Sequence, residues 1–117
     1  GYDPKQKVSD ILFRKIKSGK NHIGFITINN ALYMDGSNQY CQCGIDTSKR
    51  QVMSQIMNEY SVIDVNCGDT HTFVLINNGD WYAFGENING ECLIGSTYYT
   101  DIVPKPTKIS DKYTKDG

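Results

Sequence analysis

Short apolar runs, many of them β-branched or aromatic, alternate along this chain with polar turns rich in glycine and asparagine. Helical periodicity is poor, whereas short runs bounded by turn residues are typical of strands. In the second half, the pattern predicts strands over residues 62–67, 72–76 and 81–84. Asn77–Asp80 indicates a hairpin, because Asn and Gly accept the positive φ of a tight turn. A further strand over 104–109 contains prolines, which place it at a sheet edge.

The first half shows the same succession and predicts strands over residues 12–17, 23–28, 31–34 and 51–57. Residues 51–57 also have a second interpretation, a helical turn, and their place in the succession favours the strand. Matching the halves with an offset of 49 residues places identical residues opposite one another. Between Gly19 and Cys43 the seven identities are Gly19/Gly68, His22/His71, Asn29/Asn78, Tyr33/Tyr82, Gly36/Gly85, Asn38/Asn87 and Cys43/Cys92.

A repeat of about 50 residues is typical of a propeller blade or a solenoid unit. Four antiparallel strands in each unit favour the propeller. We therefore expect an all-β fold of two four-stranded antiparallel blades, a fragment of a β-propeller. Kelch repeats would need a double glycine and WD repeats a Trp-Asp pair, and the sequence contains neither.

The second copy carries a longer motif. Its parts, in order, are the run Val62–Cys67, Gly68-Asp69-Thr70-His71, the hairpin, Trp81-Tyr82-Ala83-Phe84-Gly85-Glu86-Asn87, Gly90-Glu91-Cys92-Leu93-Ile94-Gly95 and Pro104 before a last strand. This pattern resembles the repeat of the regulator-of-chromosome-condensation family. The first copy is degraded: Asp35 replaces Phe84, Cys41 replaces Gly90, and in the second copy Leu93 replaces Gly44. These departures leave the loop geometry of the first repeat open.

The resemblance implies that full members form a seven-bladed ring, of which this chain supplies about two blades. The chain begins with Gly1, and we expect a fragment. Residues 1–10 are assigned to an N-terminal segment or the end of a preceding repeat, 11–58 to a degenerate repeat, 59–109 to a second repeat and 110–117 to a tail. Two blades leave apolar faces uncovered, so we expect self-association or the remaining blades of a longer chain.

The repeat-defining residues are predicted to be structural: Gly19, His22, Gly36, Asn38, Gly68, His71, Trp81, Gly85, Asn87 and Gly90. For the two histidines, catalysis or metal binding is the alternative. Recurrence in register favours rings that bond backbone groups and tie the turn to the next strand. The smaller effect is expected at His22, because its repeat is degraded.

The four cysteines are Cys41, Cys43, Cys67 and Cys92. A strong zinc signal would be two Cys-x2-Cys pairs, and these are absent. Reduced structural thiols are the preferred interpretation, and a disulfide or a metal site are the alternatives. We expect no metal and no cofactor, and the thiols favour an intracellular location, nuclear or cytoplasmic.

Charge is unevenly distributed along the chain. Residues 51–104 contain no Lys or Arg but seven acids, whereas residues 1–20 are basic. The turn and loop acids form a candidate acidic binding surface: Asp69, Asp80, Glu86, Glu91 and Asp101. Packing complementarity between the blades is the alternative explanation of the same asymmetry. Nothing pairs these acids with a nucleophile, so they are not assigned acid–base chemistry.

Composition limits the class of function. The net charge of −1 and pI of about 6.1 exclude the basic footprint of a DNA-coating module, so direct nucleic-acid binding is not expected. The apolar runs are too short to span a bilayer, and no secretory signal is visible. We therefore expect a protein-interaction scaffold with no chemistry of its own. The alternative, implied by the resemblance, is guanine-nucleotide exchange on a Ran-type small GTPase by the intact propeller.

Overall fold

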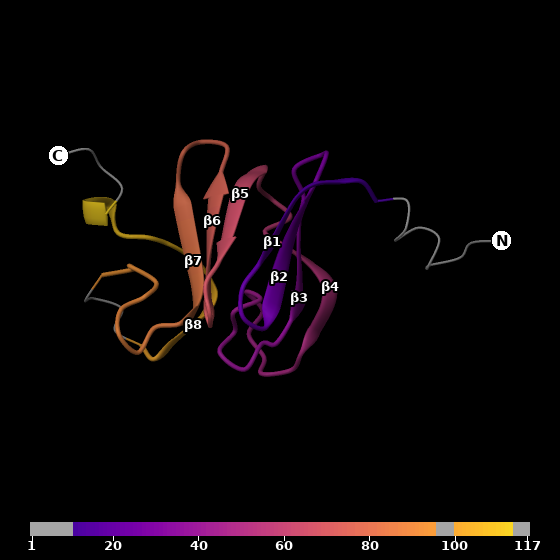
Figure 1. Ribbon diagram of the computed structural model, residues 1–117. Coiled ribbons are helices and arrows are strands. Elements are labelled where there is room, and N and C mark those ends of the chain that lie inside the picture. Colours follow the sequence, from indigo (N-terminus) through magenta and orange to yellow (C-terminus); the bar gives the residue numbers. More distant parts are fainter. Residues whose placement is uncertain (1–10, 96–99, 114–117) are drawn as a thin grey trace.

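The computed structural model describes residues 11–95 and 100–113, which form two four-stranded antiparallel sheets (Figure 1). The first sheet contains β1 (Phe13–Ser18), β2 (His22–Thr27), β3 (Leu32–Gly36) and β4 (Gln51–Ile56). The second contains β5 (Val62–Cys67), β6 (His71–Ile76), β7 (Trp81–Glu86) and β8 (Ile102–Lys108). A turn of 3₁₀ helix at Asp111–Tyr113 follows. In each sheet every strand lies beside the next in the chain, which confirms the expected all-β pair of blades.

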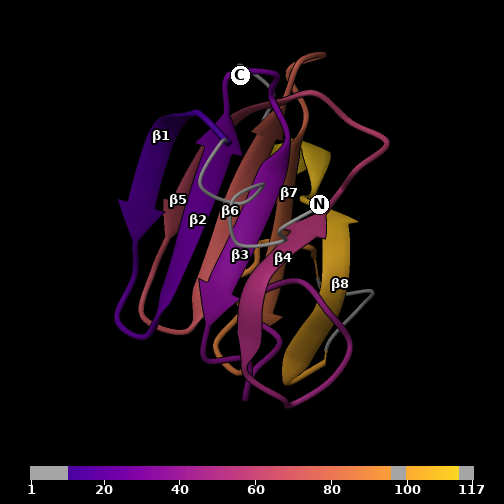
Figure 2. The same cartoon turned by 90° about the vertical axis from the view of Figure 1, so that its right-hand side faces the viewer.

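The two sheets stack face to face as two layers (Figure 1), with their strands in the same order across the molecule (Figure 2). The edge strands are β1 and β4 in the first blade and β5 and β8 in the second. Residues 51–56 form a strand, so the strand interpretation of this segment is confirmed and the helical turn is wrong. The proline-containing strand β8 lies at an edge as predicted, and it begins two residues earlier than expected, at Ile102.

Successive residues along each strand point to opposite faces of the blade, and one face of each blade packs against the other blade. In β2, Gly24 and Ile26 face the second blade, and in β6 the buried residues Thr72, Val74 and Ile76 face the first. The shared core contains Ile26, Leu32, Met34, Cys43, Ile56 and Met57 from the first repeat and Val62, Val65, Val74, Ile76 and Phe84 from the second. Burying one large side chain of this kind contributes about 1.5–3 kcal/mol, so this core holds the blades together.

The β1–β2 turn approaches the second blade so closely that only glycine fits. A Cβ atom added to Gly19 would overlap the carbonyl oxygen of Gly68. The repeat glycine therefore serves contact between blades rather than the conformation of its own turn.

A second pair of repeat glycines, Gly36 and Gly85, lies near the ends of β3 and β7. Gly36 and Gly85 have φ of 121° and 115°, a region that L side chains rarely adopt. A Cβ on Gly36 would lie 2.5 Å from the Asn21 carbonyl oxygen, and one on Gly85 would lie 2.6 Å from the Thr70 carbonyl oxygen. Both conformation and space require glycine here.

The first parts of the long loops after β3 and β7, residues 38–44 and 87–93, share one geometry despite their sequence differences. The side-chain oxygen of Asn38 accepts the Cys43 N–H at 2.8 Å, and that of Asn87 accepts the Cys92 N–H at 3.0 Å. Cys41 and Leu93, which replace glycines, adopt left-handed φ of 59° and 57°. The buried asparagine side chains organise both segments, so residues 38–44 of the first loop keep the fold of residues 87–93.

The other departure in the first repeat, Asp35, has a local partner. In the second repeat the matching residue, Phe84, fills the core between the blades. The Asp35 carboxylate instead accepts the backbone N–H of Met53 at 3.2 Å, where φ is 41° and the pairing of β3 with β4 is irregular. An acid at this position therefore satisfies the backbone of the adjoining strand.

Candidate functional site

The repeated histidine of the first blade crosses the junction to the second. His22 is 1% exposed, and its Nε2 lies 2.8 Å from the Thr72 hydroxyl oxygen. That hydroxyl donates to the Gln42 carbonyl oxygen at 2.7 Å. Thr72 therefore accepts from His22, which requires a proton on Nε2. The chain of bonds links a strand of the first blade, a strand of the second and the long loop of the first.

Burial lowers the pKa of His22, because the imidazolium loses its hydration, although the backbone carbonyl of His71 acts in the opposite direction. Nδ1 of His22 is buried and has no hydrogen-bond partner among residues 11–95 and 100–113. A ring kept neutral and used as a donor to a threonine acts as a link between blades. We predicted that the ring bonds backbone groups and ties its turn to the next strand; its side-chain partner, Thr72, lies in the next blade.

His71, the second repeated histidine, is half-buried on the opposite face of the second blade. Its ring packs edge-on against Phe73, with ring centroids 5.5 Å apart, and lies over Gly68. Trp81 is also half-buried there and packs on a smaller cluster of Ala83, Cys92, Val103 and Ile109. This face of the second blade is the counterpart of the first-blade face that forms the junction.

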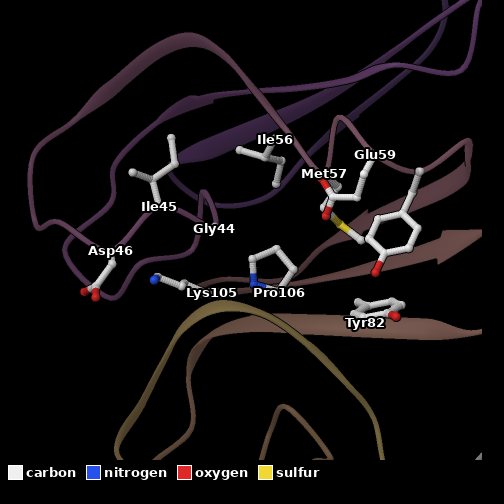
Figure 3. Close-up of a pocket in the computed structure, with 10 residues that line it drawn as sticks. Gly44, Ile45, Asp46, Ile56, Met57, Glu59, Tyr82, Lys105 and Pro106 are labelled. Atoms are coloured by element: carbon white, nitrogen blue, oxygen red, sulfur yellow. The ribbon is translucent and has the colours of Figure 1, made fainter.

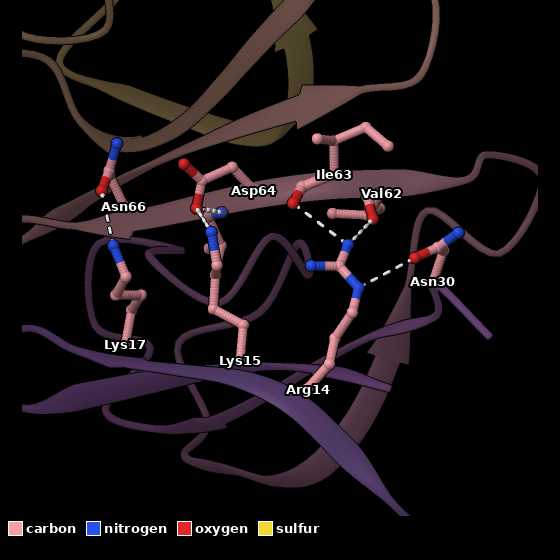
Figure 4. A network of polar contacts seen from close by, with 9 residues as sticks. Arg14, Lys15, Lys17, Asn30, Val62, Ile63, Asp64 and Asn66 are labelled. Atoms are coloured by element: carbon pink, nitrogen blue, oxygen red, sulfur yellow. Dashed lines mark hydrogen bonds and ion pairs between the residues drawn. The ribbon is translucent and has the colours of Figure 1, made fainter. Parts of the chain in front are cut away.

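Basic side chains of β1 form a row of contacts with β5 (Figure 4). Arg14 donates to the carbonyl oxygens of Val62 and Ile63 at 2.7 and 3.0 Å. Lys15 forms an ion pair with Asp64 at 3.0 Å, and the Lys17 ammonium lies 3.5 Å from the Asn66 side-chain oxygen. Part of the basic N-terminal charge is therefore packing complementarity between the blades.

Asp64 belongs to this row. Burial alone would raise the pKa of its carboxyl, but hydrogen bonds from Lys15 and the Val65 N–H, with the charges of Lys15 and Lys17, hold that pKa below its usual value. The carboxylate therefore stays ionised and paired across the junction.

The cysteine sulfur atoms are unpaired. Cys43 and Cys92 are fully buried at equivalent positions, and their thiols donate weakly to Ser37 and Glu86 carbonyl oxygens at 3.4 and 3.5 Å. Burial raises the pKa of each of these thiols to about 12. A thiol so reluctant to ionise is unsuited to nucleophilic chemistry.

The five predicted surface acids do not all lie together. Asp69 lies in the β5–β6 turn, Glu86 ends β7, and Glu91 and Asp101 lie in the β7–β8 connection, all at the same end of the second sheet. We call these four residues the acidic loop end. Asp80 lies in the β6–β7 hairpin at the opposite end and pairs with Lys108 at 3.6 Å. Two of the four have local partners: Glu86 accepts from the Thr70 hydroxyl at 2.5 Å, and Glu91 accepts the Asn89 N–H at 2.6 Å.

Across the described ranges, 11–95 and 100–113, no group of three or more His, Cys, Asp or Glu side chains converges to hold a metal ion. The same residues include no helix of the length and apolarity needed to cross a membrane. Lys5 and Lys7 of the basic N-terminal segment lie outside the described residues.

Comparison with known proteins identifies the repeat. The family model for the regulator of chromosome condensation (RCC1) repeat matches residues 29–75. This stretch runs from the β2–β3 turn into β6, so one sequence repeat joins the outer half of one blade to the inner half of the next. The chain belongs to the RCC1-repeat family, which confirms the resemblance of its motifs.

Particular relatives agree with this. Protein RCC2 homolog of Xenopus laevis is 32% identical over 107 residues, 87% of this chain and 20% of that protein. The X-linked retinitis pigmentosa GTPase regulator of Canis lupus familiaris is 33% identical over 85 residues, 70% of this chain and 8% of that protein. The chain thus spans about a fifth or less of these relatives.

Among solved structures, Prp20p from Saccharomyces cerevisiae superposes with a TM-score of 0.78 at 22% identity, over 90% of this chain and 27% of that one. That structure was described together with the binding of Prp20p to Gsp1p and histones. At this identity the likeness establishes the fold, and the two sheets are blades of a β-propeller of the RCC1 kind.

Several residues that matter at the junction escaped sequence reasoning. Thr72 matches Ile23 and Arg14 matches Ile63, so the repeat gives no signal at either position. Thr72 shares a face of its strand with Val74 and Ile76, and a threonine on an apolar face was the available sign of a polar contact. Gln42 contributes through its backbone carbonyl, which no side-chain pattern reveals.

Proposed function

We propose that this chain is part of an intracellular protein-interaction scaffold built from RCC1 repeats and performs no covalent chemistry. One observation carries the proposal: polar residues that recur in the two repeats are used to hold loops and blades. Asn38 and Asn87 organise the long loops, and His22 bonds across the junction. The exposed residues of the long loops, in contrast, differ between the repeats: Gln39 matches Ile88, for example. A constant frame with variable loops is the usual arrangement of a binding protein.

The acidic loop end is the surface we assign to a partner. Asp69 and Asp101 are exposed there, and hydrogen bonds from Thr70 and Asn89 orient Glu86 and Glu91. The sequence from residue 51 to 104 contributes no Lys or Arg to offset them. Such a surface attracts a basic protein, with a strength that falls as salt rises. The histones bound by Prp20p are partners of this chemistry.

Nucleotide exchange on a Ran-type GTPase is the second candidate. It is favoured by the names of the relatives, one of which is a GTPase regulator, and by the binding of Prp20p to Gsp1p. Exchange needs a surface assembled from loops around a ring face, which orients the GTPase while its nucleotide site opens. Because the chain spans a small part of its relatives, we assign exchange to the parent protein only as the alternative.

Two measurements on the isolated chain test these functions. In the first, fluorescence anisotropy with a labelled dimer of core histones compares the wild type with the triple variant Asp69→Asn, Glu91→Gln and Asp101→Asn. We expect binding to weaken by about tenfold, a loss of about 1.4 kcal/mol. Asp80→Asn, at the opposite end of the sheet, is the matched control and should bind as the wild type does. Equal affinity of the triple variant and the wild type, or no binding at low salt, would overturn the assignment.

The second measurement follows release of a fluorescent guanine nucleotide from a loaded Ran-type GTPase with excess chain. We expect no acceleration, because most of a ring face is lacking and losing part of an interface removes several of its dominant residues. A concentration-dependent acceleration of about tenfold or more, about 1.4 kcal/mol off the barrier, would favour the exchange factor instead.

A further inference from the structure

A groove of about 470 Å³ runs between the two blades on their outer side (Figure 3). One wall consists of the first blade's long loop and the end of β4 with the segment after it, and the other consists of β7 and β8. We call it the junction groove. Both walls belong to the described chain, so the groove is complete without another blade. Its size suits several side chains of a bound ligand.

The middle of the junction groove is apolar. Ile56 and Met57 are 7% and 6% exposed and form its floor, and Ile45 and Pro106 line it. Each sheet ends at this side, since β4 and β8 are edge strands. An extended segment lying along the groove would place alternate side chains on the apolar floor.

At one end, two tyrosine side chains form an aromatic surface. The ring centroids of Tyr60 and Tyr82 lie 5.5 Å apart with their planes inclined by 40°, and both side chains are half-buried. The faces of such rings carry partial negative charge and attract cations, arginine most often. This end of the groove therefore favours a positively charged group.

The charges around the groove point the same way. At the other end Asp46 and Lys105 both line the groove, so side chains of both signs of charge are present there (Figure 3). Glu59 lies at the tyrosine end with Tyr82 (Figure 3), is exposed, and has no hydrogen bond or ion pair within residues 11–95 and 100–113. The other nearby acid, Asp80, is paired with Lys108. One unbalanced carboxylate thus stands beside the two rings.

The pKa of Tyr82 reflects the same negatively charged surroundings. The neighbouring Tyr60 hydroxyl, burial, and the charges of Asp80 and Glu59 together raise the pKa of Tyr82 to about 12. A phenol at this end stays neutral, and an added positive charge would be stabilised.

We propose that the junction groove binds an extended peptide segment through an arginine, whose guanidinium stacks on Tyr60 and Tyr82 and pairs with Glu59. A second residue of the segment, apolar and two positions away, rests on Ile56 and Pro106. Arginine is favoured over lysine because its planar, weakly hydrated guanidinium stacks on aromatic rings and bonds a carboxylate with two N–H groups. The groove is separate from the acidic loop end, so this proposal does not rest on the proposed function.

The test uses two fluorescein-labelled, amidated pentapeptides, Ser-Arg-Ser-Leu-Ser and the same peptide with citrulline in place of arginine. Citrulline keeps the shape and removes the charge. By fluorescence anisotropy we expect the arginine peptide to bind the chain about tenfold more tightly than the citrulline peptide. Backbone amide shifts in NMR spectra should change at residues 56–60 and 82. Equal affinity for the two peptides, no binding at millimolar concentration, or shifts elsewhere would overturn the proposal.

Variants separate charge from packing. Glu59→Gln changes an exposed side chain and should remove most of the preference for arginine over citrulline, while its affinity for the citrulline peptide stays unchanged. Tyr82→Leu should weaken both peptides. Glu91→Gln, an acid of the loop end, is the matched control and should keep the full preference. If Glu59→Gln also keeps the preference for the arginine peptide, the Glu59 carboxylate does not pair with the arginine and the proposal fails. This outcome does not depend on whether Tyr82→Leu folds.

Discussion

Nε2 of His22 lies 2.8 Å from the hydroxyl oxygen of Thr72, and the two residues belong to different blades. The histidine of the first blade therefore connects it to the second, and the effect of this residue on stability depends on the blade that follows. His71, the equivalent residue, faces the open side of the second blade.

This arrangement predicts an order of stabilities. His22→Ala leaves the Thr72 hydroxyl with one fewer buried partner and should lower the free energy of unfolding by about 1–3 kcal/mol. Thr72→Val should lower the free energy of unfolding by a similar amount. The double variant His22→Ala/Thr72→Val should lower it by less than the sum of the two single effects, because each substitution removes the same hydrogen bond. His71→Ala should cost less than His22→Ala, the reverse of the order expected from the degraded repeat. Urea unfolding measures all four, and a larger loss for His71→Ala would contradict the assignment.

Stability should depend on pH through His22. Because burial lowers its pKa in the folded state, the unfolded chain binds the proton more tightly. The free energy of unfolding should be level above about pH 6.5, the ordinary histidine pKa, and should fall as pH decreases below it. Urea titrations between pH 8 and 5 measure the slope of the free energy of unfolding against pH. Asp64 stays ionised over this range, because its pKa is lowered. The slope should shrink in His22→Gln, and an unchanged slope would show that another group is responsible.

Gly19→Ala tests the close approach of the blades. The new Cβ would overlap the Gly68 carbonyl oxygen, so the junction must open. A loss of about 1–3 kcal/mol, typical of overpacking, is expected in thermal or urea unfolding. Ser18→Ala, at the exposed neighbouring position, should be nearly neutral. Equal stability of the two variants would mean that the junction accommodates the added methyl group.

The thiols should be free and unequal in reactivity. Titration with a thiol reagent should detect four free thiols in the denatured, unreduced protein, and a lower number would reveal a disulfide. In the native protein Cys43 and Cys92 should react slowest, because burial raises their pKa to about 12 and the thiolate is the reactive form. Replacing both with Ser should remove the slow phase. A fast reaction of either residue in the wild type would show that its loop opens readily.

The open face of the second blade should promote association between copies. Phe73, Trp81 and Leu93 line a hollow of about 420 Å³ there. A second copy docked as the second blade docks on the first would place Ile23, the counterpart of Thr72, opposite His71, so no hydroxyl is offered and association should be weak. Light scattering at rising concentration should show it, and Trp81→Glu should reduce it. Val52→Glu, an exposed residue of β4, is the control. A monomer at every concentration would contradict this prediction.

Much of this protein was determined by the sequence alone. The offset between the halves, the Asn77–Asp80 hairpin and the apolar runs predicted two four-stranded blades, because turn chemistry and strand alternation are local properties. The recurring Gly36 and Gly85 were recognisable as structural, since their conformation excludes other residues. The edge position of β8 followed from its prolines.

Only the tertiary structure decided which residues meet across the junction. His22 reaches Thr72, and Arg14 reaches the backbone of β5, because stacking brings together positions about 50 residues apart that share no pattern. It also separated Asp80 from the other surface acids, since antiparallel strands send successive turns to opposite ends of a sheet. The junction groove is formed by residues of both packed blades, so no single segment of the sequence predicts it. Local chemistry specifies the blade, whereas the surfaces between blades arise from how the blades are stacked.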